Sequence, residues 1–179
     1  MTEEAVKDPK RYKKTLNLPK TAFPMKANLV QNEPASIKRW GKLDVYGKLR
    51  TKRKEDNAEA FVFHDGPPYA NGDIHLGHLL NKCLKDFVVR SRSMLGYDCP
   101  YTPGWDCHGL PIEHKVMSDL VDAGKVQKLL GLEEDVRRIA IRRECQRHAE
   151  KFWKLHTGQM QRLLTLADYE DPYLTMHAR

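Results

Sequence analysis

The spacing of apolar residues along the chain predicts one helix in the middle and a longer one near the end. From Leu76, apolar residues recur every three or four positions as far as Gly96, which is typical of an amphipathic helix and its stop. Residues 133–164 are expected to form one long helix or two in succession, because acidic residues at their start favour a helix N-terminus. A short helix is expected after Pro111.

Two strands are predicted around the first of these helices. Residues 59–64 are rich in aromatic and β-branched side chains, and their pairing must stop at the turn formed by residues 65–68 with its two prolines. Residues 99–102 are the second predicted strand. The order strand, helix, strand, helix is typical of an α/β unit with a parallel sheet.

The N-terminal part has a different pattern. Four prolines interrupt residues 1–34, so we expect an extended arm whose scattered apolar side chains pack on another part of the protein. Residues 35–54 predict a short helix. Their apolar side is formed by Ile37, Trp40, Leu43 and Tyr46.

The positive charge of the chain is concentrated in this N-terminal part. The 179 residues have a formal net charge of +7, yet residues 1–58 alone hold 15 Lys and Arg against 7 Asp and Glu. The densest cluster is Lys48, Arg50, Lys52, Arg53 and Lys54. Such a cluster fits nucleic-acid phosphates, and it fits equally well a solvated helix end.

The cysteines argue against export and against a zinc site. The chain has four of them and no Cys-x-x-Cys pair, no secretory signal and no apolar run of the ~20 residues that a membrane helix needs. We therefore expect a reducing cytoplasm and no membrane contact. Cys107 and His108 stand near Cys99 and His114 but lack the paired spacing of structural zinc sites, so no metal ligands are expected.

The candidate chemistry begins at His75-Leu76-Gly77-His78. At the start of a helix, the two histidines share a face beside unpaired backbone N–H groups, where anions bind. Two imidazoles there can donate hydrogen bonds to phosphate oxygens as charge builds up during attack on phosphorus. Taken alone, two histidines at this spacing are more often an accident of a helix surface than a phosphate site.

Longer stretches around these histidines resemble the class I aminoacyl-tRNA synthetases. The run from Phe63 to Gly72, followed by His-x-Gly-His, is similar to the first signature of that family. The block Gly104–Glu113 is similar to the pattern of its isoleucine-specific branch. Shorter matches to that branch are Phe23-Pro24-Met25, Asn81-Lys82, Leu84-Lys85-Asp86 and Pro172–Met176. The resemblance covers nearly the whole chain and is most specific over residues 63–115.

The resemblance implies a role for individual residues. ATP contacts are expected at Pro68, Asn71, His75, Gly77 and His78, and the two histidines are also the expected catalytic residues. Amino-acid contacts are expected at Gly66, Pro67 and Asp106, with Asp106 binding the substrate ammonium group. A carboxylate at a strand end is well placed for that role, although an isolated Asp there is also typical of a turn.

The resemblance also implies a fold and a reaction. It implies a Rossmann-like α/β unit, with residues 1–58 as a basic arm and helix and residues 59–179 as the first half of a catalytic domain. The reaction is the joining of isoleucine to ATP, with Mg²⁺ on the phosphates, and transfer to tRNA, by an enzyme expected to be a monomer.

The chain also departs from the family pattern. The lysine-rich second signature, Lys-Met-Ser-Lys-Ser, is absent, and the last residues lie about where the family's editing insertion begins, so we expect an N-terminal, incomplete piece of the enzyme. Three alternatives stay open. They are valine or leucine specificity, a non-catalytic module that binds tRNA or nucleotide, and a piece that is partly unfolded by itself.

Overall fold

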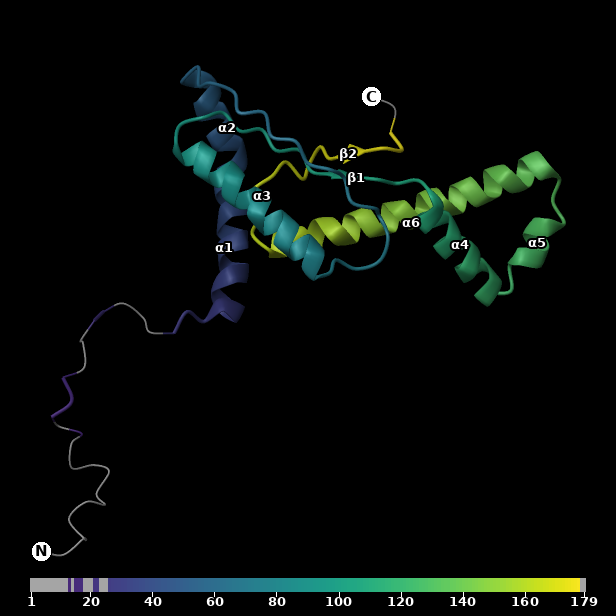
Figure 1. Cartoon of the computed structure of the whole chain (residues 1–179), viewed down its shortest axis with the longest axis horizontal. Helices are drawn as coiled ribbons and strands as arrows, with labels where there is room; N and C mark the ends of the chain where they lie inside the picture. The colour runs from purple at the N-terminus through teal and green to yellow at the C-terminus, as the bar shows by residue number, and fades with distance from the viewer. Residues whose placement is uncertain (1–12, 14, 18–20, 23–25, 178–179) are drawn as a thin grey trace, which may run out of the picture.

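The computed structural model describes residues 13, 15–17, 21–22 and 26–177 (Figure 1). Most of the predicted arm, including Phe23-Pro24-Met25, lies outside these residues. Within the described part, Leu16 is exposed rather than packed on the protein.

Six helices and two short strands make up the described fold. The helices are α1 (Leu29–Leu43), α2 (Val45–Glu55), α3 (Leu76–Met94), α4 (Leu110–Asp122), α5 (Val126–Leu130) and α6 (Glu134–Arg162). The strands are β1 (Gly104–Trp105) and β2 (Tyr173–Leu174). The predicted helix from Leu76 is confirmed, and residues 133–164 form one helix rather than two. No helix in the described ranges is both long and apolar enough to cross a membrane.

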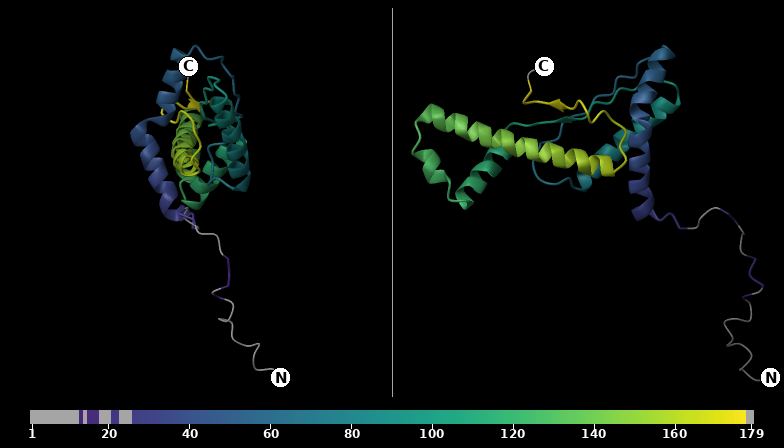
Figure 2. Two further views of the ribbon diagram at one scale, coloured as in Figure 1. Left: turned by 90° about the vertical axis from the view of Figure 1, so that its left-hand side faces the viewer. Right: turned by 180° about the vertical axis from the view of Figure 1, so that it is seen from behind.

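The long helix α6 organises the arrangement of the other elements (Figure 1). Helices α1, α2 and α3 lie at one end of the molecule, and α4 and α5 lie at the other. Seen along its axis, α6 runs between α1 on one side and α3 on the other, in the left view of Figure 2. The two strands lie along one side of α6, so the loops before α3 and after β1 meet near its middle.

The sheet is parallel, as expected, but the two predicted strands are wrong. β1 pairs with β2, with Gly104 opposite Tyr173 and Trp105 opposite Leu174. Residues 59–64 pair with the segment after α3 only at an isolated parallel bridge between Ala60 and Asp98. Pro100 and Pro103 explain this, because they have no N–H groups to continue a ladder along residues 99–103.

The N-terminal helices also differ from the prediction. Helix α1 begins at Leu29, inside the predicted arm, and Pro34 lies within it. The single helix expected over residues 35–54 is divided at Asp44, which has a left-handed backbone (φ 47°). The Asp44 carboxylate accepts the Gly47 N–H at 3.2 Å, so one residue ends α1 and caps α2.

The main core lies between α4, α6 and the two strands. Trp105, Ile112 and Ala149 are fully buried in it. The other buried members are Ala70, Cys107, Val116, Leu120, Met160 and Leu174. A second, smaller core joins Val89 of α3 to Cys99 and Tyr101.

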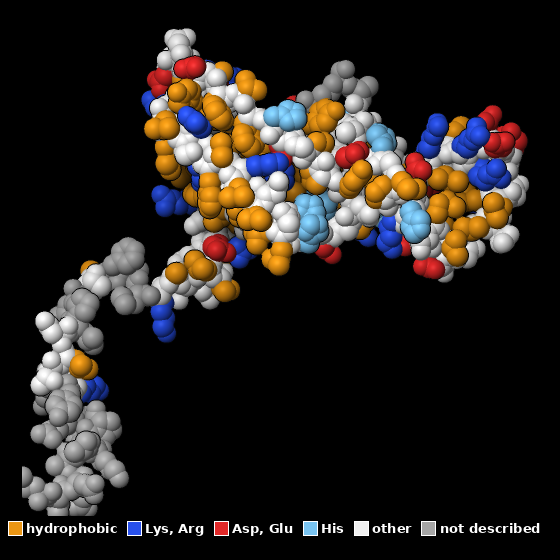
Figure 3. Space-filling model, viewed as in Figure 1, with side chains coloured by type: hydrophobic (Ala, Val, Ile, Leu, Met, Phe, Trp, Pro, Cys, Tyr) orange, Lys and Arg blue, Asp and Glu red, His pale blue; other side chains and the backbone are white. Residues whose placement is uncertain are grey.

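Helix α3 buries the side that carries Lys82, Asp86, Val89 and Ser93, and most of its apolar residues lie on the other side. Lys82 and Asp86 are buried, whereas Leu76, Leu84 and Phe87 are 80%, 54% and 64% exposed. Hydrophobic side chains accordingly gather on the surface over α2 and α3 in Figure 3. An amphipathic helix usually turns its apolar face to the core. For α3 this rule predicts a different buried face from the one observed.

Candidate active site

His75 and His78 together cap the N-terminus of α3. His75 is the N-cap residue, and its Nδ1 accepts the Gly77 N–H at 3.0 Å. The Nδ1 of His78 accepts the backbone N–H of His75 at 3.2 Å, which completes a capping box made of imidazoles. Because both Nδ1 atoms act as acceptors, each neutral ring carries its proton on Nε2. The helix start thus offers two Nε2–H donors for an anion.

Gly77 is required by this cap. A Cβ atom at position 77 would lie 2.8 Å from Cε1 and 3.0 Å from Nδ1 of the His75 ring. Any larger residue would push that ring away from the helix start. The resemblance implied an ATP contact at this glycine, and the His75 ring gives a second reason for glycine within the chain itself.

His78 is held in its neutral form by its surroundings. Burial lowers its pKa, and the neighbouring His75, His156 and Lys82 lower it further. The rings of His75 and His78 lie 4.1 Å apart, centre to centre. At neutral pH His78 is therefore a hydrogen-bond donor without a full charge.

Asp106 lies directly after β1 and has one carboxylate oxygen to spare. Its Oδ1 accepts the His108 N–H at 3.2 Å and the Thr175 hydroxyl at 3.3 Å. Within the described chain no hydrogen bond is made to its Oδ2. Oδ1 thus holds the local loop, whereas Oδ2 keeps its capacity to accept a further hydrogen bond. Thr175, which follows β2, was missed by sequence reasoning.

The loop that contains Gly66, Pro67 and Pro68 is bonded to the backbone of Asp106. The Asp106 N–H donates to the Pro68 carbonyl at 2.8 Å, and the Ala70 N–H donates to the Asp106 carbonyl at 2.8 Å. The residues expected to line the amino-acid pocket thus adjoin the expected ammonium acceptor. Gly66 and Pro67 are exposed, and the space beside the Gly66 Cα is open.

Asn71 is used within the chain. His148 of α6 is bonded through Nε2 to the Asn71 Oδ1 at 3.0 Å, and the Asn71 amide donates to the Pro111 carbonyl at 3.4 Å. Its side chain therefore ties the loop before α3 to both α4 and α6. These contacts show Asn71 holding the loop in place, whereas the resemblance implied a contact with ATP.

Helix α6 contributes further residues that the sequence gave no reason to select. Gln159 accepts the Ile74 N–H at 3.2 Å and donates to Asp73 at 2.8 Å. His156 is bonded to the carbonyl of Gly72 at 2.6 Å. These side chains lie far from the signature in sequence, and only the fold places them against its loop.

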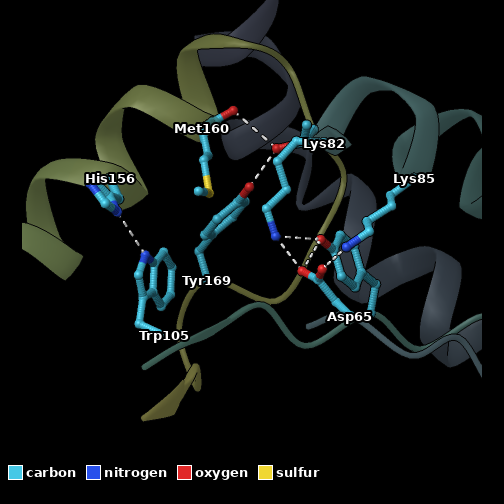
Figure 4. Close-up of polar contacts among 9 residues, drawn as sticks. Asp65, Lys82, Lys85, Trp105, His156, Met160 and Tyr169 are labelled. Carbon is cyan, nitrogen blue, oxygen red and sulfur yellow. Dashed lines mark hydrogen bonds and ion pairs between the residues drawn. The ribbon is translucent and has the colours of Figure 1, made fainter. Parts of the chain in front are cut away.

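A buried ion cluster supports the other side of the loop. Lys82 and Lys85 of α3 both bond to the Asp65 carboxylate, and the Tyr101 hydroxyl donates to it at 2.8 Å (Figure 4). Burial alone would raise the pKa of Asp65, but the hydrogen bonds from the two lysines outweigh it and hold that pKa below its usual value. Burial lowers the pKa of Lys82 against the opposing attraction of Asp65. Asp65 adjoins Gly66, so the cluster attaches the residues expected to line the amino-acid pocket to α3.

The basic cluster on α2 is partly used inside the protein. Arg50 forms an ion pair with Asp98, and Arg53 donates to the Ser93 carbonyl at 2.7 Å. These two cations attach α2 to the segment around the end of α3.

The cysteines and nearby histidines are not gathered as metal ligands. Cys99 and Cys107 are buried, and burial raises the pKa of the Cys107 thiol. His108 lies with Nε2 at 3.3 Å from the Thr175 carbonyl. Across the described ranges, no three residues of the types His, Cys, Asp and Glu are grouped so that they could hold a metal ion.

Comparison with known proteins gives a consistent set of relatives. The family model described as tRNA synthetases class I (I, L, M and V) matches residues 35–179. An isoleucine--tRNA ligase of Kosmotoga olearia is 49% identical over 164 residues, which is 92% of this chain and 17% of that protein. Those of Methylococcus capsulatus and Nitrosococcus oceani are 50% and 51% identical, over 94% and 93% of this chain. The chain spans about a sixth of the length of these curated relatives.

Proposed function

The chain belongs to the tRNA synthetases class I (I, L, M and V), and from this we propose that it carries the amino-acid and ATP site of an isoleucine–tRNA ligase. In this proposal Asp106 binds the ammonium group of isoleucine. Gly66 and Pro67 line the amino-acid pocket. ATP contacts Pro68, Asn71, His75, Gly77 and His78.

One observation carries the proposal. The backbone of Asp106 is hydrogen-bonded to Pro68 and Ala70, and from Ala70 only residues 71–74 lead to the histidine cap of α3. One short loop, hydrogen-bonded to Asp106 at one end and continuous with the histidine cap at the other, thus connects the free carboxylate oxygen to the two imidazole donors. A cationic amine and an anionic phosphate are the ligands that such donors and acceptors recognise.

The reaction follows from these roles. A carboxylate oxygen of isoleucine attacks the α-phosphorus of ATP, a new oxygen–phosphorus bond forms, and the bond to the bridging oxygen breaks to release pyrophosphate. The Nε2–H groups of His75 and His78 stabilise the charge that builds on the phosphate oxygens. The acyl group then passes to a ribose hydroxyl at the 3′ end of tRNA, and AMP leaves.

Several finer expectations belong to the same proposal. The parallel β1–β2 pair flanked by helices supports a Rossmann-like unit beginning at residue 59, preceded by the basic segment 1–58. The four unpaired thiols suit a cytoplasmic location. A monomer and tRNA binding are inferred from the family alone. Mg²⁺ would arrive on the ATP phosphates.

Isoleucine-dependent exchange of pyrophosphate into ATP tests this function. We expect exchange that requires isoleucine and that valine supports about 10–200-fold less well, since one methylene in an apolar pocket discriminates by about 1–3 kcal/mol. A preference for valine or leucine would reassign the substrate. A cooperatively folded chain without any exchange would contradict catalysis by this segment.

A further inference from the structure

His156 is a buried histidine of α6 with a hydrogen bond on each ring nitrogen. Its side chain is fully buried. Its Nδ1 lies 3.2 Å from the indole Nε1 of Trp105, and a dashed line in Figure 4 marks this hydrogen bond. Its Nε2 lies 2.6 Å from the Gly72 carbonyl oxygen. Both ring nitrogens are therefore occupied within the protein.

The chemistry of the two partners fixes the state of the ring. An indole N–H can only donate, so the Nδ1 of His156 must accept and carries no proton. A carbonyl oxygen can only accept, so Nε2 must carry the proton and donate it to Gly72. Burial lowers the pKa of His156, although the bond to Gly72 opposes this, so the neutral ring is kept. His156 is thus a fixed bridge in a single tautomer.

The bridge joins the two halves of the site. Trp105 is the residue immediately before Asp106, at the end where the amino acid is expected. Gly72 lies in the loop that leads into His75 and the phosphate end. The ring of His156 also lies 5.8 Å from that of His78, centre to centre. One side chain of α6 therefore spans from the amino-acid half to the nucleotide half.

We propose that His156 is a positioning residue that sets the distance between the amino-acid half and the phosphate half of the site. The inference rests on the proposed function, because the distance between the halves matters only for a ligand that occupies both of them at once. Such a ligand is an aminoacyl-adenylate. Isoleucine alone or ATP alone occupies one half and depends less on the spacing.

This role differs from ordinary core packing in what it affects. A histidine that only fills space contributes to the free energy of unfolding. Its substitution does not change the affinity of the folded chain for any one ligand selectively. A residue that sets the spacing also affects how much more tightly the aminoacyl-adenylate binds than isoleucine alone or ATP alone. A ligand that engages two sites at once can bind about 10²–10⁴-fold more tightly than either part alone, and this gain is lost when the sites are wrongly spaced.

Two substitutions at position 156 separate these roles. His156→Gln retains one acceptor and one donor, so it can bond to Trp105 and Gly72 together, whereas His156→Leu can bond to neither. The probe is the sulfamoyl analogue of isoleucyl-adenylate, titrated calorimetrically beside isoleucine alone and ATP alone. We expect His156→Leu to weaken binding of the analogue about 100-fold and of each single substrate less than about fivefold. His156→Gln is expected to recover most of the loss.

Met160→Ala is the matched control, because Met160 is buried one turn further along α6 and contacts neither loop end through a polar bond. It should lower the unfolding free energy without a selective loss of analogue binding. The indole N–H signal of Trp105 in a ¹H–¹⁵N spectrum should shift in His156→Leu and stay near its original position in His156→Gln.

The outcomes distinguish the two proposals. If the folded wild-type chain does not bind the analogue, the proposed function fails and the spacing role falls with it. If the wild type binds and His156→Leu binds equally well, the spacing role alone is wrong. It is also wrong if Met160→Ala loses analogue binding as selectively, or if His156→Gln recovers nothing.

Discussion

Asp65→Asn is expected to destabilise the chain by about 3–5 kcal/mol, which is a large share of the 5–15 kcal/mol of a typical domain. The substitution leaves the buried ammonium group of Lys82, whose side chain is 3% exposed, without its carboxylate partner. Lys85 loses the same partner. Urea unfolding followed by circular dichroism at pH 7 measures the change.

Lys82→Met should cost much less than Asp65→Asn. It removes the lysine that burial penalises, while Asp65 keeps its bonds to Lys85 and Tyr101. The double variant should be more stable than the sum of the two single losses predicts, because the two residues share one interaction. Equal losses from the two single variants would contradict the assignment of Asp65 as the shared partner.

The pH dependence of stability has a definite sign. The pKa of Asp65 is lower in the folded chain than its ordinary value of 3.8, so the unfolded chain binds this proton more readily. The stability that Asp65 contributes is therefore present above about pH 4 and is lost as the pH falls through the lower, folded pKa. Asp65→Asn should remove that part of the acid sensitivity.

His75→Asn is expected to lower the rate of pyrophosphate exchange by about 100-fold or more without lowering stability. Asparagine is a favoured N-cap residue, and its side-chain oxygen can accept the Gly77 N–H in place of the His75 Nδ1. It cannot supply the Nε2–H donor to the phosphate. Removal of one such donor typically costs 10²–10³-fold in rate.

His75→Ala completes the comparison, because it removes both functions of the ring. Its rate of pyrophosphate exchange should fall as much as that of His75→Asn. Its free energy of unfolding should also fall by about 0.5–2 kcal/mol, which is the usual cost of deleting a cap. Exchange rates and urea unfolding curves of the two variants together separate the cap from the donor. If His75→Asn exchanges at the wild-type rate, the proposed catalytic role of His75 is wrong.

Helices α3 and α6 were predictable because their cause is local. The repeat of apolar residues and the acidic start locate α3 and α6 to within a few residues. The strands were not, because β propensity in residues 59–64 says nothing about the partner segment. Pro100 and Pro103 lie in that partner, and their missing N–H groups limit the pairing to one bridge at Ala60.

The rotation of α3 was also beyond local reasoning. The sequence shows an apolar side, yet the Asp65 carboxylate draws the opposite side, with Lys82, into the protein. A buried carboxylate seventeen residues earlier in the chain cannot be recognised from the helix itself. The ion cluster is thus a tertiary effect that overrides amphipathic pattern.

The geometry of the candidate site was predictable only where its residues follow each other in sequence. The histidine pair and its helix start could be recognised from residues 75–78, and the cap geometry adds the tautomer of each ring. The supports could not be recognised in this way. Thr175 and His156 reach the site only through the fold, and a lone histidine in a charged helix is ordinarily a surface residue.

Calorimetric titration of the sulfamoyl analogue of isoleucyl-adenylate into the wild-type chain and Asp106→Asn tests the central claim most directly. The account predicts that the wild type binds and that Asp106→Asn binds about 10–100-fold more weakly, because the ammonium group loses a charged acceptor while Oδ1 can still hold the His108 loop. A folded wild type that does not bind, or an Asp106→Asn variant that binds as tightly, would contradict it.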